Sequence, residues 1–226
     1  MTVTLGFDVY GTLIDTHGVV VQLQTLIGDQ AVAFSNTWRE KQLEYTFRRG
    51  LMGKYRNFPV CTKDALEYAC AVYKTSLSGE QKQNLLAGYL TLPSFADVSQ
   101  GLDELQAAGF HMYAFSNGIS DALETLLTNA GIRDYFIGVV SVDDVQTFKP
   151  SPAVYEHFLN VTGSTANGAW LISSNPFDVI GAISADMNAA WVQRSNTSIF
   201  DPWGIEPTVT VNSLSGLDRH IIDSLR

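Results

Sequence analysis

Short apolar runs alternate with helix-periodic segments along most of the chain. Five of these runs have the length and the apolar, β-branched content of buried strands, and turn residues bound them. They lie at residues 3–9, 111–116, 138–142, 169–173 and 189–194. The segments with helical spacing of apolar positions lie at residues 98–108, 119–130, 153–161 and 177–187. This alternation predicts an α/β fold with a doubly wound, Rossmann-like parallel sheet.

Residues 17–92 do not follow this alternation. They contain long amphipathic stretches at 31–50 and 62–74 and no convincing strand. We therefore expect a helical cap domain of residues 17–92, inserted into a catalytic core of residues 1–16 and 93–226. Residues 217–226 have the pattern of a closing helix.

Composition narrows the class of protein. The chain has 226 residues and is 46% hydrophobic, which fits one large domain or one domain with an insertion. No apolar run approaches the roughly 18 residues of a membrane span, and no basic signal-peptide head is present. Cys61 and Cys70 lie nine residues apart in one helical-looking stretch, which does not suit a disulfide framework. We therefore expect reduced core thiols and a cytoplasmic protein. The net charge of −9 argues against nucleic-acid binding.

Polar clusters follow the predicted strands at the ends where parallel α/β sheets bind ligands. They occupy residues 8–12, 116–118, 149 and 173–178. Each has an ordinary alternative: a turn residue for Asp8, a helix start for Ser116 and Asn117, a solvated loop charge for Lys149, and a first-turn helix acid for Asp178. Their convergence at successive strand ends favours a functional site.

These clusters resemble the motifs of the haloacid dehalogenase superfamily. DVYGTL (8–13) is similar to its first motif, SNG (116–118) to its second, Lys149 to its third and SSNPFD (173–178) to its fourth. Because the order along the chain also agrees, the resemblance implies a Rossmann-like core with an inserted cap.

Two positions distinguish the branches of the superfamily. Its phosphatases carry a second Asp two residues after the nucleophile, where this chain has Tyr10, and usually an acidic residue where this chain has Ser174. Both differences remove oxygen ligands or proton donors that Mg²⁺-dependent phosphoryl transfer uses. The cap segments WREKQLEY (38–45) and LMGKYRNF (51–58) instead resemble the (S)-2-haloacid dehalogenases. A small-molecule phosphatase or phosphonatase is the alternative, and a non-catalytic binding protein is a more distant one.

The resemblance implies a reaction on carbon. Asp8 would displace halide from C2 of a short (S)-2-haloacid to form an aspartyl ester, and water would hydrolyse the ester to the (R)-2-hydroxy acid. Halide leaves as an anion and needs no proton donor. The resemblance also implies that no metal or other cofactor takes part, and it suggests a homodimer.

The same resemblance assigns roles to individual residues. The expected catalytic residues are Asp8, Thr12, Arg39, Lys149, Ser173, Asn175 and Asp178. The expected substrate-binding residues are Tyr10, Leu43, Phe58, Ser116, Asn117, Tyr155 and Phe177.

Within these groups, Arg39 and Asn175 would bind the departing halide. Ser116 and nearby backbone amides would hold the substrate carboxylate. Lys149 would pair with the nucleophile and with Asp178, and Asp178 would position or deprotonate the hydrolytic water.

Several of these residues also fit purely structural roles. Arg39 could be a solvated helix charge, Leu43 and Phe58 could be cap core, and Tyr155 lies on an apolar helix face. Two residues differ from the family pattern: Glu40 stands where an amide is expected, and Phe177 stands where an indole is often found. Both differences bear on halide binding and on the size of the substrate pocket.

Overall fold

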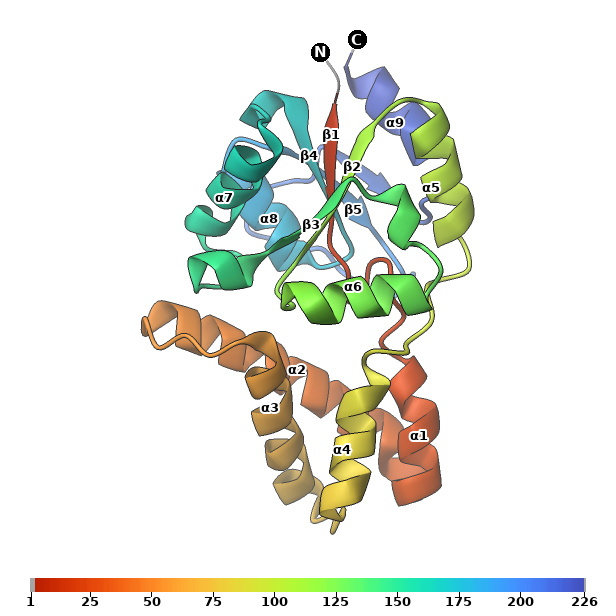
Figure 1. Ribbon diagram of the computed structural model, residues 1–226, viewed down its shortest axis with the longest axis vertical. Coiled ribbons are helices and arrows are strands. Elements are labelled where there is room, and N and C mark those ends of the chain that lie inside the picture. The colour runs from red at the N-terminus through yellow and green to blue at the C-terminus, as the bar shows by residue number, and fades with distance from the viewer. Residues whose placement is uncertain (1–2, 226) are drawn as a thin grey trace.

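Six parallel strands form one sheet in this computed structural model, which describes residues 3–225 (Figure 1). The order across the sheet is β3-β2-β1-β4-β5-β6. The strands are β1 Thr4–Phe7, β2 His111–Ser116, β3 Gly138–Ser141, β4 Ala169–Ser173, β5 Asn188–Val192 and β6 Val209–Val211. All residues of β1 and β4 are buried, because helices cover both faces of the sheet. The predicted fold class is confirmed.

The five expected strands are all present: β2 and β4 have the predicted bounds, β1 and β3 are shorter, and β5 begins and ends earlier than predicted. The sixth strand, β6, was missing from the prediction. It has three residues, of which only Val211 is buried, and it pairs with β5 at the edge of the sheet. The sequence signal for β6 is a run of four β-branched residues at 208–211, which is shorter than the apolar runs used to predict the other strands.

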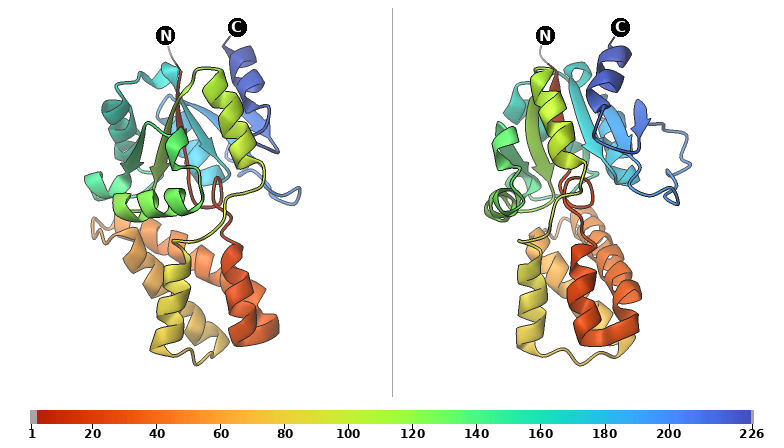
Figure 2. Two further views of the ribbon diagram at one scale, coloured as in Figure 1. Left: turned by 45° about the vertical axis from the view of Figure 1, so that its right-hand side comes forward. Right: turned by 90° about the vertical axis from the view of Figure 1, so that its right-hand side faces the viewer.

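Helices of the core lie on opposite faces of the sheet. The core helices are α5 Val98–Ala107, α6 Ser120–Asn129, α7 Pro152–Thr162, α8 Pro176–Ser184 and α9 Leu217–Ser224. Helix α5 packs against α9 on one face, and α7 packs against α8 on the other (Figures 1 and 2). Short 3-10 turns lie at Gly28–Gln30, Arg133–Tyr135, Val142–Val145 and Ala166–Gly168.

Four helices form the inserted cap beside the carboxyl ends of the strands (Figures 1 and 2). They are α1 Gly18–Ile27, α2 Ala31–Leu51, α3 Phe58–Tyr73 and α4 Gly79–Gly88. The fully buried Trp38 joins α2 to α3 by donating its indole N–H to the Thr62 carbonyl at 2.8 Å. Helix α4 begins with a capping box between Ser78 and Gln81.

The chain enters and leaves the cap through two segments that lie side by side. The Asp15 amide donates to the Pro93 carbonyl at 2.9 Å, and the Phe95 amide donates to the Leu13 carbonyl at 3.0 Å. The predicted boundaries at 16/17 and 92/93 fall beside these bonds and stay a prediction. Residues 1, 2 and 226 of the predicted core lie outside the described residues.

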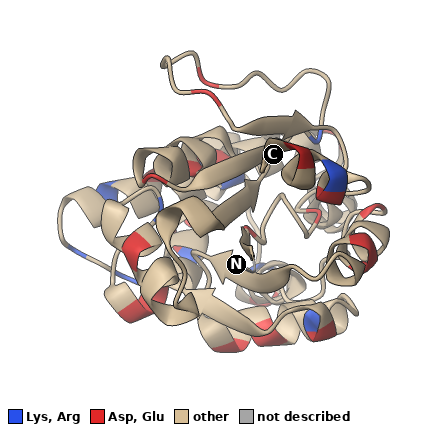
Figure 3. Ribbon diagram, turned by 90° about the horizontal axis from the view of Figure 1, so that it is seen from above, with Lys and Arg blue, Asp and Glu red and all other residues tan. Residues whose placement is uncertain are grey.

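The charge of the protein is not gathered on one face. Asp and Glu are distributed around the periphery when the molecule is seen from above (Figure 3). Within residues 3–225, none of the helices has the length and hydropathy needed to cross a membrane.

Candidate active site

Asp8 lies directly after β1, at the carboxyl edge of the sheet. Its Oδ2 atom accepts hydrogen bonds from Asn175 Nδ2 at 2.7 Å, Thr12 Oγ1 at 2.9 Å and Ser173 Oγ at 3.4 Å. Its Oδ1 atom instead lies 3.6 Å from Lys149 Nζ. One carboxylate oxygen is therefore held by three donors, while the other keeps lone pairs available beside a cation.

The turn after Asp8 brings Thr12 back over the carboxylate. Gly11 makes this possible because its φ of +86° lies in the region that favours glycine. The Thr12 hydroxyl oxygen accepts the Ser174 amide at 2.8 Å, and Ser174 Oγ donates to the Gly11 carbonyl at 2.7 Å. These bonds tie the loop after β1 to the loop after β4. Ser174 therefore joins the two loops. It stands at the position where phosphatases of the superfamily usually have an acidic residue.

Lys149 lies between two carboxylates. Its side chain is 1% exposed, and Nζ donates to Asp178 Oδ2 at 2.8 Å and to the Phe115 carbonyl at 2.8 Å. The ammonium also lies 4.1 Å from the centre of the Phe115 ring. A buried ammonium needs such partners, because leaving it unpaired costs several kcal/mol (about 3–5). Lys149 therefore links Asp8 electrostatically to Asp178.

Asp178 is fully buried in the first turn of α8. The Tyr155 hydroxyl donates to Asp178 Oδ1 at 2.9 Å, opposite the oxygen that Lys149 holds. Gly181 permits this approach, because a Cβ there would lie 2.2 Å from the Tyr155 hydroxyl. Burial raises the pKa of Asp178 to about 6, Asp8 adds to the rise, and Lys149 opposes it. Such a carboxylate can accept a proton near neutral pH.

Ser116 and Asn117 lie at the end of β2 on the same edge. Ser116 Oγ accepts the Gly118 amide at 3.2 Å, which leaves its hydroxyl proton available to a ligand. Asn117 Oδ1 accepts the backbone amide of Lys149 at 3.0 Å. Both side chains are buried. Asn117 therefore fixes the loop that carries Lys149, while Ser116 can act as a donor.

Arg39 reaches the core from α2 of the cap. Its Nη2 donates to the Tyr10 carbonyl at 3.4 Å, and Asn175 Nδ2 donates to the same carbonyl at 3.4 Å. Burial lowers the pKa of Arg39, while Tyr89, Asp8 and Tyr10 oppose that shift. Arg39 forms no ion pair with any residue in the range 3–225. The two predicted halide-binding residues thus lie together, one from the cap and one from the core.

Aromatic side chains line the junction of cap and core. Tyr10 and Phe58 stack with their ring centres 5.4 Å apart, and Phe177 contacts Phe47 edge-on at 5.1 Å. Burial raises the pKa of Tyr10 above its ordinary range, so its phenol stays neutral. Leu43 is half-buried, one helical turn after Arg39.

The structure thus brings together Asp8, Thr12, Lys149, Ser173, Asn175, Asp178, Ser116 and Asn117 from the core, with Arg39 and Phe58 facing them from the cap. Tyr155 differs from these residues because it contacts Asp178 from the interior of the core. It is fully buried behind Asp178, so a substrate contact by Tyr155 stays a prediction.

Comparison with known proteins agrees with this geometry. Residues 3–186 match the family model for haloacid dehalogenase-like hydrolases. An (S)-2-haloacid dehalogenase of Pseudomonas putida is 37% identical over 97% of this chain and 96% of its own length. The chain belongs to the haloacid dehalogenase-like hydrolases. Its similarity to several (S)-2-haloacid dehalogenases places it in the (S)-2-haloacid dehalogenase subfamily.

Solved structures extend the agreement to the whole fold. L-2-haloacid dehalogenase from Xanthobacter autotrophicus superimposes with a TM-score of 0.90 at 30% identity, over 99% of both chains. The same enzyme with chloropropionic acid covalently bound also gives 0.90 at 30% identity, over 98% of this chain and 99% of that one.

Two residues of this dehalogenase-like site were not predicted. Tyr89 on the cap lies 6.2 Å from Tyr10, ring centre to ring centre, and is buried. Gln42 accepts a hydrogen bond from Arg39 at 2.7 Å. A sequence pattern could have revealed Gln42, because a glutamine there occupies one position of an otherwise buried face of α2. The other positions of this face include Phe34, Trp38 and Thr46.

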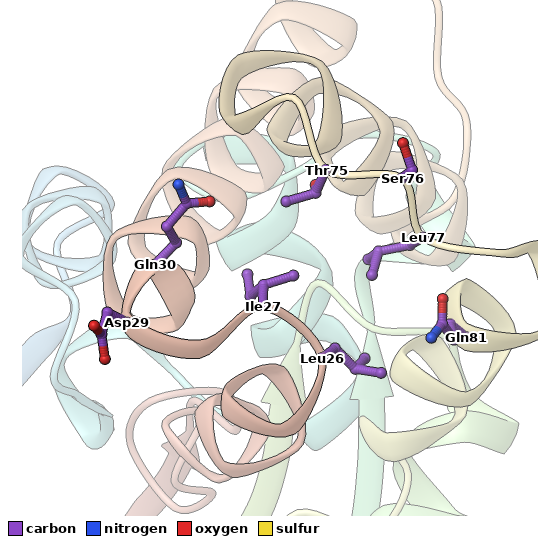
Figure 4. A pocket seen from close by; sticks show the side chains of 8 residues that line it. All are labelled: Leu26, Ile27, Asp29, Gln30, Thr75, Ser76, Leu77 and Gln81. Atoms are coloured by element: carbon purple, nitrogen blue, oxygen red, sulfur yellow. The ribbon is translucent and has the colours of Figure 1, made fainter.

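Cavities adjoin the site on several sides. Tyr10 and Phe58 line an apolar cavity of about 470 Å³, while Lys149 and Phe177 line another of about 490 Å³. A larger cavity of about 600 Å³ lies at the far tip of the cap, between the end of α1 and the loop before α4 (Figure 4). That cavity is lined by Leu26, Ile27, Asp29, Gln30, Thr75, Ser76, Leu77 and Gln81, none of them a predicted site residue.

Proposed function

We propose that this protein hydrolyses short (S)-2-haloacids to (R)-2-hydroxy acids through an ester on Asp8. One observation carries the proposal. Asp8 Oδ2 is occupied by three donors, whereas Oδ1 lies free beside Lys149, and the cap places Arg39 close by. Such a carboxylate is prepared to attack an electrophile with a single defined oxygen.

In the first step, Asp8 Oδ1 attacks C2 of the substrate in line with the carbon–halogen bond. The new C2–O bond forms as the carbon–halogen bond breaks, the electron pair leaves with the halide, and C2 inverts. Arg39 and Asn175 receive the halide, because both place N–H donors at the junction of cap and core.

In the second step, water attacks the carbonyl carbon of the Asp8 ester. Asp178 accepts one proton of the water, the bond between that carbon and the ester oxygen breaks, and the departing oxygen takes up the second proton of the water. The hydroxy acid keeps the former oxygen of Asp8, while the oxygen of water enters the carboxylate. The raised pKa of Asp178 supports its role as the base. Ser173 and Thr12 hold Asp8 during both steps.

The substrate carboxylate binds at the Ser116 hydroxyl and the amides around Asn117 and Tyr10. Apolar walls for the alkyl group are formed by Tyr10, Leu43, Phe58 and Phe177. Tyr155 acts through Asp178, since its hydroxyl bonds to that carboxylate.

The phosphatase alternative is less well supported by the chemistry of the site. Tyr10 carries a neutral buried phenol where a phosphatase has its acid, and Ser174 binds the loop after β1. We also propose that residues 17–92 act as the cap domain and that no metal or other cofactor takes part in the reaction.

We propose a cytoplasmic homodimer as the working form. Both cysteines are free and buried, which suits a reducing compartment. Leu51, Met52, Tyr68 and Val72 expose apolar surface on α2 and its neighbours in the cap, which suits contact with a second copy. Light scattering after size-exclusion chromatography gives the oligomeric state directly.

Halide release from each enantiomer of 2-chloropropionate, measured in EDTA, tests the proposed function. We expect release from the (S) enantiomer alone, with (R)-lactate as the product. Phosphate release from phosphoglycolate that requires Mg²⁺, without release of halide, would establish the phosphatase alternative instead.

A further inference from the structure

Gln42 contacts Arg39 from the interior of the cap. It is fully buried on α2, three residues after Arg39. Its Oε1 atom accepts Arg39 Nη1 at 2.7 Å, and its Nε2 atom donates to Thr62 Oγ1 at 2.6 Å. A buried glutamine is costly unless its amide is paired, and these two bonds pair both ends.

The direction of this chain of hydrogen bonds is fixed by Thr62. The Thr62 hydroxyl donates to the Phe58 carbonyl at 2.9 Å, so its oxygen accepts from Gln42 Nε2. The Oε1 atom of Gln42 must then face Arg39, the orientation in which it accepts from a guanidinium. The same chain ends at Phe58, whose ring stacks on Tyr10. Both cap residues that face the core are therefore joined through Gln42.

Arg39 also lines a cavity formed by the cap and the segment that leads into it. This polar cavity of about 260 Å³ is lined by Thr16, His17, Ser35, Asn36, Arg39, Glu40 and Tyr89. Glu40 is exposed and forms no ion pair with the other residues in the range 3–225. A guanidinium that turned into this cavity would approach the Glu40 carboxylate, whose charge would attract it. On the core side, the described contact of Arg39 is the 3.4 Å bond to the Tyr10 carbonyl.

We propose that Gln42 is a positioning residue that holds the Arg39 guanidinium towards Asp8 and against the polar cavity. This inference rests on the proposed function, in which Arg39 receives the halide. Gln42 does not touch the substrate. It acts through Arg39, so its effect belongs to the displacement step and not to hydrolysis of the ester.

Gln42→Leu tests the inference, because leucine removes the acceptor and suits a buried position. We expect kcat/KM for (S)-2-chloropropionate to fall roughly tenfold, as for loss of a hydrogen bond to a charged group. Single-turnover halide release should slow by the same factor, while the preformed ester should hydrolyse at the wild-type rate. Thr37→Val is the matched control: Thr37 bonds to Tyr73 across the same pair of helices without touching Arg39, and its rates should stay unchanged.

Double variants separate positioning from a general packing defect. Adding Glu40→Gln to Gln42→Leu should restore part of the lost rate, because the competing carboxylate is gone. Adding Gln42→Leu to Arg39→Lys should cause no further loss. The inference would be overturned if Gln42→Leu lowered the rate equally in the wild-type and Arg39→Lys backgrounds. It would also be overturned if a folded Gln42→Leu enzyme were as fast as Thr37→Val.

Bromide affinity by isothermal titration provides a readout without turnover. Gln42→Leu should weaken bromide binding roughly tenfold against the wild type and Thr37→Val. If the wild type releases no halide but Gln42→Leu still weakens bromide binding, the proposed function fails while the positioning role stands. If bromide binds Gln42→Leu and the wild type equally, the positioning role fails.

Discussion

The two sides of the candidate site are held in very different ways. On the core side, Asp8, Lys149 and Asp178 are linked by hydrogen bonds and ion pairs that come from four loops of the sheet. On the cap side, Arg39 has one short bond, to Gln42 of its own helix, and one bond of 3.4 Å to the core.

The difference indicates that the core and the cap contribute to different steps of the proposed reaction. Asp8 directly follows β1, and Asp178 lies in the first turn of the helix after β4, so the sheet fixes the positions of both carboxylates before a substrate binds. Arg39, which we propose binds the halide, stands on a helical unit that joins the core through two paired segments. Variants on the two sides should therefore affect different steps.

The largest expected effect is on the core side. Asp178→Asn should lower turnover at least about a thousandfold, because the base for ester hydrolysis is lost. Displacement should continue, so the protein should gain the mass of the substrate without its halide. Intact-protein mass spectrometry after incubation with (S)-2-chloropropionate measures this gain. Rapid turnover by a folded variant with no adduct would contradict the role of Asp178.

The matching variant on the cap side should affect the other step. Arg39→Lys should slow single-turnover halide release about a hundredfold, because a point charge replaces a fork of donors at the halide. The ester, once formed, should hydrolyse at the wild-type rate. Rapid-quench measurement of halide and product separates the two steps. A loss confined to ester hydrolysis would remove the distinction between the sides.

The dependence on pH should also separate the steps. Protonated Asp178 cannot accept the proton of water, so ester hydrolysis should slow as the pH falls below the pKa of Asp178, which in the ester lies below about 6 because esterified Asp8 no longer carries the charge that raises it. Stability should move in the opposite direction. The folded state binds this proton more tightly than the unfolded state does, so its contribution is greatest below pH 3.8 and is lost as the pH rises through about 6. Single-turnover rates measured from pH 5 to 8 give the first trend. A flat profile for hydrolysis would exclude Asp178 as the base.

The smallest expected effect concerns the wall of the pocket. Phe177→Trp adds a larger ring and an N–H donor beside Phe47. We expect the ratio of kcat/KM for bromo- and chloropropionate to change about threefold, with little change in stability, since hydrogen bonds at such a position add modest discrimination. Phe47→Leu serves as a control for packing alone. An unchanged ratio would place Phe177 outside the halide contact.

The core side was also the more predictable side from sequence. Asp8, Lys149 and Asp178 follow separate apolar runs, and parallel strands bring their carboxyl ends to one edge, so the alternation of strands and helices predicted that they share this edge. No such rule applies to the cap. The contacts of Gln42 and Tyr89 depend on the orientation of α2 and α4 relative to the loop after β1. The periodicity of apolar residues predicts a helix but does not predict its orientation.

The edge of the sheet shows the same limit. β6 was missed because its β-branched run at 208–211 is short, and it buries one valine in three residues where it pairs with β5. The apolar strands were predicted, including the edge strand β3, while β6 and the orientations of the cap helices were not.

The central claim is that Asp8 attacks carbon and that water then attacks Asp8. A single turnover of excess enzyme with (S)-2-chloropropionate in ¹⁸O-labelled water tests it most directly. Peptide mass spectrometry should find the label in the Asp8 carboxylate, and the hydroxy acid from that turnover should carry none. Label found only in the hydroxy acid would mean that water attacks C2 directly, and it would contradict the ester mechanism.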